Sequence, residues 1–133
     1  MVFLKNMKTL TQLTEEADAL FSKVVRLKYA DENGNAWCVT CGDSYHWKEI
    51  QNGHFISRDK FNTRYDLRNC HPQCGTCNSK HNDNRDPYRM FMLRTYPAGT
   101  ITELLALSFK FVSSLDKRII LEKTIKECKS ILK

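Results

Sequence analysis

The sequence predicts an α+β fold, in which a small β-containing core is flanked by one N-terminal helix and two to three C-terminal helices. Three observations support this prediction. Apolar residues recur at helical spacing near both ends, the middle of the chain is poor in aliphatic residues, and four of the six cysteines stand there in two Cys-x-x-Cys pairs. At 133 residues with 41% hydrophobic content, the chain is expected to form a single domain over residues 1–133.

The first predicted element is an amphipathic helix over residues 11–30. Its apolar positions recur at steps of four and three, namely Leu13, Ala17, Leu20, Val24 and Leu27. Asn33-Gly34 follows and is typical of a tight turn that ends the helical segment.

Residues 36–84 are predicted to form a zinc-bound core. Each pair, Cys38-x-x-Cys41 and Cys74-x-x-Cys77, can bend into a knuckle that aims two thiolates at one point about 2.3 Å away. Taken alone, either pair could instead be a redox dithiol or two unconnected cysteines. A structural metal would supply the stability that this aliphatic-poor segment lacks. Cys70 has poorer ligand spacing, so we expect it to be a structural thiol.

Within this core we expect a short strand pair over residues 47–56, a polar loop over 58–68 and a short helix over 73–82. Helices then follow over residues 86–132. Asp86-Pro87 is expected to begin the first of them, with Asp86 as N-cap, and Thr100-x-x-Glu103 reads as a capping box for the next. The last helix should begin near Leu115 and bury Cys128.

The charge balance favours a polyanionic partner such as DNA. Lys and Arg total 21 against 15 acidic residues, a formal net charge of +6. A merely soluble basic protein would have the same total, but many of the cations lie in or just after the cysteine-bracketed segment. The expected DNA-binding residues are Arg58, Lys60, Arg64, Arg68, Lys80, Arg85 and Arg89.

We expect a cytoplasmic protein with no membrane partner. Val2-Phe3-Leu4 is interrupted by Lys5 and Lys8, so it does not read as a signal peptide, and no apolar run is long enough to span a bilayer. Cysteines spaced as zinc ligands fit a reducing compartment better than a disulfide framework.

Three polar residues of the core could carry hydrolytic chemistry on a phosphodiester. His54 is the candidate general base, because its ordinary pKa lies near neutrality. Asn69 is the candidate residue that orients the imidazole or pins the loop against it. Asn78 is the candidate ligand of a catalytic Mg²⁺ or Mn²⁺ through its carbonyl oxygen, and His81 and Asn82 could provide a second ligand from the same helix face.

This order of residues resembles the zinc-containing HNH (ββα-metal) nucleases, and most closely the NinG/Rap family of phage recombination endonucleases. The likeness covers about residues 37–94. The residues that carry it are Cys38-Val39-Thr40-Cys41-Gly42, Trp47, Gly53-His54-Phe55-x-x-Arg58, Tyr65-Asp66-Leu67-Arg68-Asn69, His71, Gln73-Cys74-x-x-Cys77-Asn78 and Asn84-x-x-Pro87-Tyr88-Arg89.

The resemblance implies metal-dependent cleavage of branched DNA, such as D-loops and Holliday junctions. By position, it makes His54 the water-activating base, Asn69 the loop-holding residue and Asn78 a metal ligand, with the four paired cysteines on structural zinc. Many HNH nucleases place Asp or His just before the base, whereas this chain has Gly53. The second ligand is therefore unassigned, with His81, Asn82 and Asp59 as candidates.

Two other functions stay open from the sequence. One is a less selective HNH nuclease that nicks ordinary duplex DNA, and the other is a non-catalytic zinc module that binds DNA or protein. A homodimer would suit a branched substrate, because two active sites could then act on two strands.

Overall fold

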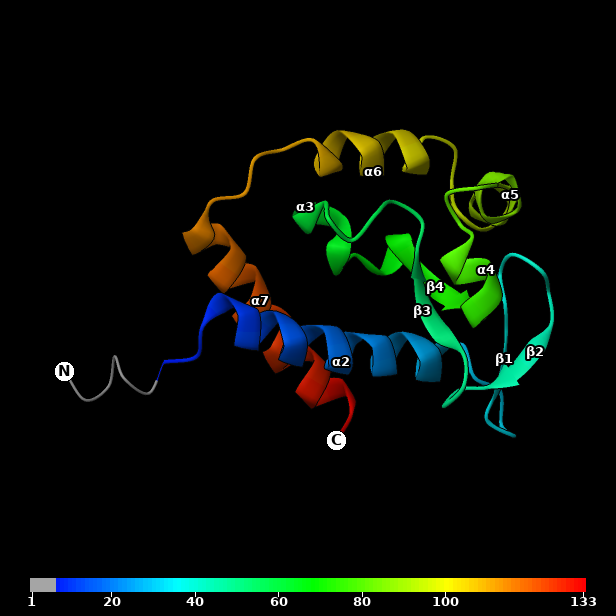
Figure 1. Cartoon of the computed structure of the whole chain (residues 1–133), viewed down its shortest axis with the longest axis horizontal. Coiled ribbons are helices and arrows are strands. Elements are labelled where there is room, and N and C mark those ends of the chain that lie inside the picture. The colour runs from blue at the N-terminus through cyan, green and yellow to red at the C-terminus, as the bar shows by residue number, and fades with distance from the viewer. Residues whose placement is uncertain (1–6) are drawn as a thin grey trace. The chain divides into compact units, whose positions relative to one another are not determined.

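The computed structural model describes residues 7–133, and Figure 1 shows the order of its elements. Val2-Phe3-Leu4 and Lys5, on which the signal-peptide argument depends, lie outside the described residues. The chain divides into two compact units. Residues 25–111 form the middle unit, and the N-terminal residues up to 24 together with residues 112–133 form the terminal unit. The single domain over residues 1–133 stays a prediction.

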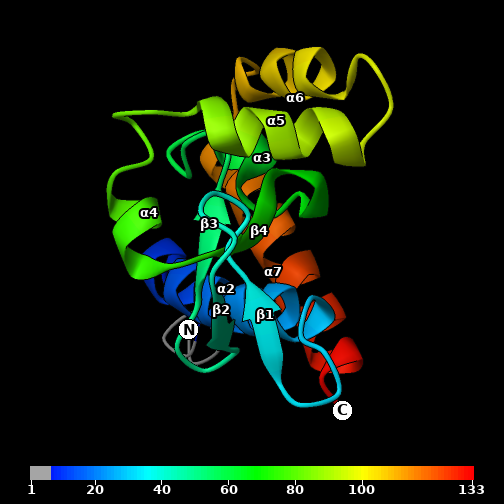
Figure 2. The ribbon, with the colours of Figure 1, turned by 90° about the vertical axis from the view of Figure 1, so that its right-hand side faces the viewer.

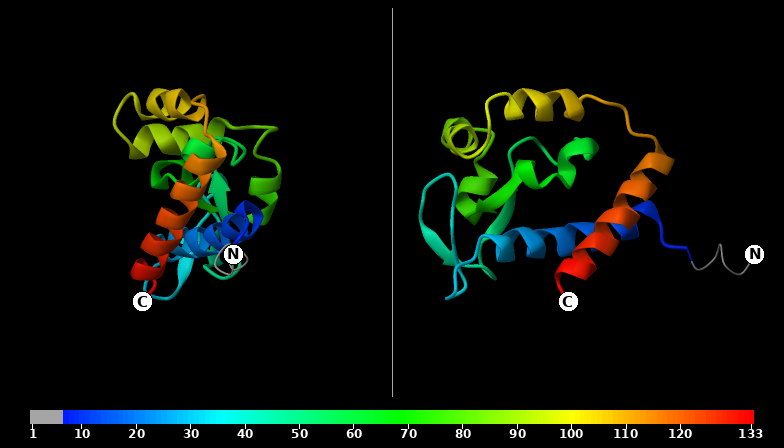
Figure 3. Two further views of the ribbon diagram at one scale, coloured as in Figure 1. Left: turned by 90° about the vertical axis from the view of Figure 1, so that its left-hand side faces the viewer. Right: turned by 180° about the vertical axis from the view of Figure 1, so that it is seen from behind.

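The terminal unit is built from two helices whose apolar faces are buried. Helix α2 (Leu10–Lys28) begins in this unit and continues into the middle unit, and α7 (Ser114–Ile131) crosses its N-terminal part (Figures 1 and 3). Helix α2 contributes Leu13, Ala17 and Phe21 to the buried residues, and α7 contributes Leu121 and Cys128. Both the predicted N-terminal helix and the burial of Cys128 are confirmed.

The middle unit contains two small antiparallel sheets. Strands β1 (Asn35–Trp37) and β2 (Ser44–His46) form one hairpin, and β3 (Gln51–His54) pairs with β4 (Cys70–Gln73) in the other sheet. Both pairs can be followed in Figure 2. Strands and helices therefore occur together in residues 7–133, which confirms the α+β class.

The predicted strand pair within residues 47–56 is wrong. Strand β2 ends at His46, before that range, and β3 pairs instead with β4, so that Gly53 lies opposite His71 and His54 opposite Cys70. Strand pairing depends on which edges meet in space, and a local pattern carries no information about a partner that far along the chain.

The segment before β4 is more helical than predicted, and the segment after β4 is less helical than predicted. The predicted loop 58–68 contains α3 (Phe61–Arg64) and a 3₁₀ turn (Leu67–Asn69). The helix predicted over 73–82 is shorter, because α4 covers only Gly75–Ser79.

Helix α5 (Asp86–Thr95) is seen end-on in Figure 1, whereas α6 (Thr100–Ser108) lies across that view, so the two helices cross rather than run side by side. Asp86 is the first helical residue of α5 rather than its N-cap. The predicted capping box of α6 is also wrong, because its N-cap is Gly99 with φ 93°. The Thr100 hydroxyl donates to the Pro97 carbonyl at 2.9 Å, and the Glu103 carboxylate pairs with Arg68. A true capping box opens α7 instead, between Ser113 and Asp116.

Two buried clusters stabilise the middle unit on either side of β3. One joins the residues that follow β3 to the two later helices and contains Phe55, Ile56, Tyr88, Met92 and Leu104. The other surrounds the paired cysteines and contains Ala36, Cys38, Ile50 and Cys74. His54 at the C-terminal end of β3 is thus held in place, because Ile50 before the strand and Phe55 and Ile56 after it are packed in these clusters. None of the helices formed by residues 7–133 has the length and apolar character needed to cross a bilayer.

Candidate functional site

The four paired cysteines come together in the middle unit. The Sγ atoms of Cys38, Cys41, Cys74 and Cys77 all lie within 4.8 Å of one another, and Cys41 Sγ is 4.0 Å from Cys74 Sγ. Four sulfurs about 2.3 Å from one zinc ion would be about 3.8 Å apart in a regular tetrahedron. The donor set and its spacing therefore suit a zinc ion.

Each cysteine pair forms a knuckle that turns its thiols inward. The Cys41 N–H donates to Cys38 Sγ at 3.5 Å, and the Cys77 N–H donates to Cys74 Sγ at 3.4 Å. Gly42 has φ 82°, which lets the chain leave the first knuckle through the left-handed region. The Val39 N–H donates to the Pro72 carbonyl at 3.0 Å and so ties the first knuckle to β4.

The thiol of Cys38 is prepared for ionisation. Burial raises its pKa, but backbone hydrogen bonds from Cys41, Cys74 and Thr40 outweigh that effect and lower the pKa to about 7. Burial instead raises the pKa of Cys77, so Cys38 ionises before Cys77 and is the readier of the two to bind zinc as a thiolate. Cys70, by contrast, is buried on β4 and does not belong to the cluster.

His54 is the last residue of β3 and is half-buried. Its Nε2 atom lies 2.9 Å from the Arg64 carbonyl oxygen. A carbonyl can only accept, so Nε2 carries a proton, and in a neutral ring the lone pair is then on Nδ1. An imidazole held in one tautomer in this way is suited to accept a proton.

Asn69 is fully buried and links the loop to the end of β3. Its Oδ1 accepts from the Ile56 N–H at 2.8 Å, and its Nδ2 donates to the carbonyls of Ile56 and Thr63 at 3.0 and 3.1 Å. The Asn69 carbonyl also accepts from the Phe55 N–H at 2.9 Å. The amide therefore holds the segment that contains Arg64, whose carbonyl contacts His54.

Asn78 lies in α4, directly after the last cysteine of the cluster. Its Nδ2 donates to Gln51 Oε1 at 3.0 Å, a bond in which the side-chain Oδ1 of Asn78 takes no part. His81 and Asn82 follow the C-terminus of α4 at Ser79, so the expectation that they share its helix face is wrong. Nε2 of His81 contacts the Phe55 carbonyl at 2.9 Å, and Asn82 Oδ1 accepts from Arg85 at 2.7 Å. Asp59 is exposed on the loop.

A buried His–Tyr network is bonded to β3, and no role was predicted for it from the sequence. The Tyr88 hydroxyl donates to the Gly53 carbonyl at 2.8 Å and lies 2.8 Å from His71 Nδ1. The Tyr96 hydroxyl lies 2.6 Å from the other ring nitrogen of His71, Nε2. Burial, helped by the charge of Lys28, lowers the pKa of His71 to about 3, so this imidazole is neutral. His71 and Tyr88 are among the residues that carry the resemblance described from the sequence, which was the only sequence signal for them.

The basic residues expected to bind DNA differ in their exposure to solvent and in their ion pairs with carboxylates. Arg58, Lys60, Lys80, Arg85 and Arg89 are exposed. The half-buried Arg68 donates to the Asp66 carboxylate at 2.8 Å and to Glu103 at 3.0 Å. Those carboxylates raise its pKa above the ordinary value and already balance its charge.

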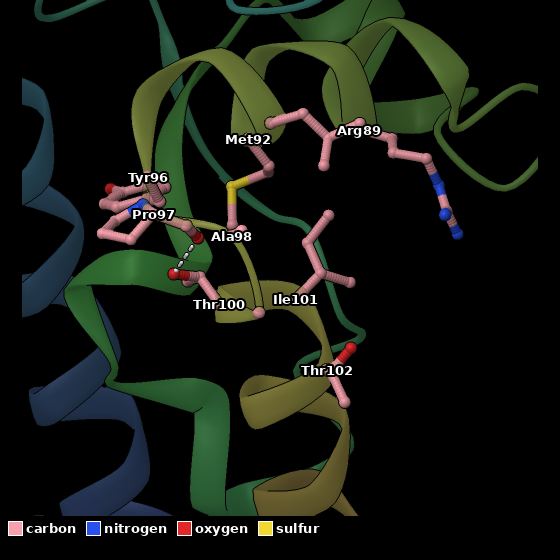
Figure 4. Close-up of a pocket in the computed structure, with 10 residues that line it drawn as sticks. Arg89, Met92, Tyr96, Pro97, Ala98, Thr100, Ile101 and Thr102 are labelled. Atoms are coloured by element: carbon pink, nitrogen blue, oxygen red, sulfur yellow. Dashed lines mark hydrogen bonds between the residues drawn. The ribbon is translucent and has the colours of Figure 1, made fainter.

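A pocket of about 300 Å³ lies where α5 turns into α6 (Figure 4). Met92, Tyr96 and Ile101 are among the residues that line it, and the guanidinium of Arg89 extends away from the others. None of the side chains predicted to be catalytic lines this pocket. It is thus separate from the cysteine cluster and His54.

A comparison with protein-family models found a match to the bacteriophage lambda NinG protein family over residues 2–130. Searches of curated proteins and of solved structures found no match. The family match spans nearly the whole chain and includes the cysteine cluster, His54, Asn69 and Asn78. The chain therefore belongs to the NinG family.

Proposed function

We propose that this protein is a metal-dependent DNA endonuclease that cuts branched recombination intermediates such as D-loops and Holliday junctions. The observation that supports this most directly is the setting of His54. Its Nε2 donates to the Arg64 carbonyl, at the end of a strand adjoining the four-cysteine cluster. The order β3, β4, α4 also follows that of an HNH ββα core, which we propose it to be.

In this proposal His54 takes a proton from the attacking water at Nδ1. General-base catalysis requires the imidazole to be neutral and fixed in direction. The Arg64 carbonyl fixes its tautomer, and Asn69 holds the segment that carries this carbonyl. The carbonyls on either side of His54 are held by Tyr88 at Gly53 and by His81 at Phe55.

A divalent ion, Mg²⁺ or Mn²⁺, would stabilise the charge that develops on the phosphate when bound. Asn78 would hold it through its carbonyl oxygen, a ligand that suits hard cations. The arrangement favours Asn78 over His81 and Asn82, because His81 holds the Phe55 carbonyl and Asn82 accepts from Arg85.

The zinc ion that suits the cysteine cluster would be structural, since four thiolates leave no open position for substrate. The exposed cations Arg58, Lys60, Lys80, Arg85 and Arg89 would contact phosphates and make binding fall steeply with salt. A phage-encoded enzyme of this kind would act in the cytosol of the host cell.

The test is a cleavage assay on a labelled four-way junction, a D-loop and a matched linear duplex with Mg²⁺ or Mn²⁺. Wild type is compared with His54→Ala and with His46→Ala, a histidine on β2 that serves as the matched control. The expected result is cutting of the branched substrates by wild type and the control, and loss of cutting in His54→Ala with the zinc content unchanged. Cleavage retained in His54→Ala would remove this residue from the mechanism.

Other outcomes of the same assay identify the alternatives. Equal cutting of the linear duplex would make the enzyme a less selective nicking nuclease. Salt-sensitive binding without any cutting would favour a non-catalytic zinc module, an alternative consistent with Gly53, which provides no side-chain ligand.

We also propose that the protein acts as a homodimer on branched DNA, because a two-fold pair of active sites could address two strands. Multi-angle light scattering of the free protein and of its junction complex tests this. A single copy in both states would contradict it.

A further inference from the structure

The amide of Gln73 has one end that the protein satisfies and one that it does not. The residue is fully buried on β4. Its Nε2 donates to Thr40 Oγ1 at 2.8 Å and lies 3.5 Å from the Cys77 carbonyl. Because that carbonyl can only accept, the NH₂ group must face it, and Oε1 faces the other way. Oε1 is buried and has no hydrogen-bond partner among residues 7–133, which ordinarily costs about 1–3 kcal/mol.

This oxygen lies beside Gly53. A Cβ built on Gly53 would be 2.2 Å from Gln73 Oε1 and 2.7 Å from Gln73 Cβ. In an aspartate the carboxylate oxygens are about 2.4 Å from Cβ, as bond lengths and angles require. Gln73 Oε1 is therefore about as far from the Gly53 Cβ position as the oxygen of an aspartate at position 53 would be. A side chain at position 53 and the observed position of the Gln73 side chain exclude each other, because both would occupy the same space.

Asn78 approaches the same face of the sheet. Gln51 pairs with Gln73 and Gly53 with His71, so these four residues point to one side of β3–β4. The Asn78 side chain donates to Gln51 on that side, and the Cys77 carbonyl next to it lies against the Gln73 amide. Two side-chain carbonyl oxygens, one from Gln73 and one from Asn78, are thus brought to one face.

We infer that Gln73 supplies, through Oε1, the ligand to the catalytic divalent ion that Gly53 cannot. The inference rests on the proposed nuclease function and names a residue of that site. Side-chain amide oxygens bind hard cations such as Mg²⁺ and Mn²⁺, although without the charge of a carboxylate. Two other buried polar atoms also have no partner in the described residues, Asn52 Oδ1 and His81 Nδ1. Asn52 points to the side of β3 away from Gly53 and Gln73, so it does not replace a ligand at position 53, and a nitrogen ligand suits these ions less well than oxygen does.

The experiment measures Mn²⁺ binding to the full-length, zinc-loaded protein by the loss of the free-ion electron paramagnetic resonance signal. Gln73→Leu is expected to weaken binding at least about tenfold, and Gln73→Glu to tighten it by about tenfold because it adds a negative charge. Thr40→Val is the matched control. It removes the hydrogen bond to Nε2 but leaves Oε1, so it should bind Mn²⁺ as wild type does.

Zinc content and circular dichroism show which variants remain folded, and Gln73→Glu gives a gain that misfolding cannot produce. A second variant tests the geometry: Gly53→Asp combined with Gln73→Ala should restore the Mn²⁺ binding that Gln73→Leu loses. Equal affinity in wild type, Gln73→Leu and Gln73→Glu would overturn the inference, as would a wild type that binds no Mn²⁺. Mn²⁺ binding that depends on Gln73, without any DNA cleavage, would instead count against the nuclease function alone.

Discussion

Replacing Asn69 with alanine should destabilise the middle unit strongly. The side chain makes three buried hydrogen bonds to backbone groups, at 2.8, 3.0 and 3.1 Å. Each is worth about 1 kcal/mol, and the Ile56 and Thr63 groups left behind are buried and would lack partners. We therefore expect the free energy of unfolding to fall by about 4 kcal/mol, a large share of the ~5–15 kcal/mol of a typical domain.

The assay is urea denaturation followed by tryptophan fluorescence. Trp37 and Trp47 both belong to the middle unit, so their signal reports on the unit that contains Asn69. Asn62→Ala is the matched control. The Asn62 amide donates to the carbonyls of Leu107 and Lys110 at 3.2 and 3.1 Å but is only half-buried, so its loss should cost about 1 kcal/mol or less.

The comparison refutes the reasoning if Asn69→Ala is no less stable than Asn62→Ala. The buried amide would then not be what fixes the loop against the end of β3. If the proposed nuclease function also holds, Asn69→Ala should lose DNA cleavage together with stability, whereas His54→Ala should lose cleavage with a much smaller change in urea midpoint, because the half-buried His54 bonds to the Arg64 carbonyl where the fully buried Asn69 makes three bonds to backbone groups.

Three further predictions follow from the same structure. Chelating the zinc proposed for the cluster, or Cys74→Ser, should unfold residues 31–86 and not only abolish the proposed cleavage, because a zinc ion there would contribute folding free energy; protected amides after verified metal removal would contradict this. Stability should fall as the pH drops from 6.5, the ordinary pKa of His71, towards its folded value of about 3, since only the unfolded chain gains that proton. The expected loss at pH 5 is about 2 kcal/mol, measured as the change in urea midpoint, and His71→Gln should remove that part of the slope. Gly53→Ala should cost about 1–3 kcal/mol in thermal melts, because its Cβ would lie 2.2 Å from a buried side chain. Gly75→Ala, whose Cβ would be 3.2 Å from a more yielding neighbour, should change the melting temperature little, and equal effects of the two would argue against the close contact.

The sequence by itself determined those features that depend on local spacing. The spacing of apolar residues predicted α2 to within two residues at each end, because residues three or four positions apart lie on the same face of a helix. The Cys-x-x-Cys spacing identified the cysteine cluster. Each pair forms a local turn that directs two thiols to one point, and two such pairs complete the four ligands of one zinc ion. Asn33-Gly34 marked the turn before β1, where Gly34 has φ 82°.

Only the tertiary structure decided which groups meet across the chain. The partner of β3, the ion pairs that occupy Arg68 and the contact between Gly53 and Gln73 all join residues separated by many others in sequence. Thr100 and Glu103 show the same limit within four residues: they have the capping-box pattern, but Glu103 pairs with Arg68 from the loop instead. A side chain with several possible partners takes the one that the packed fold brings nearest, and that choice is made by distance in space rather than by spacing along the chain.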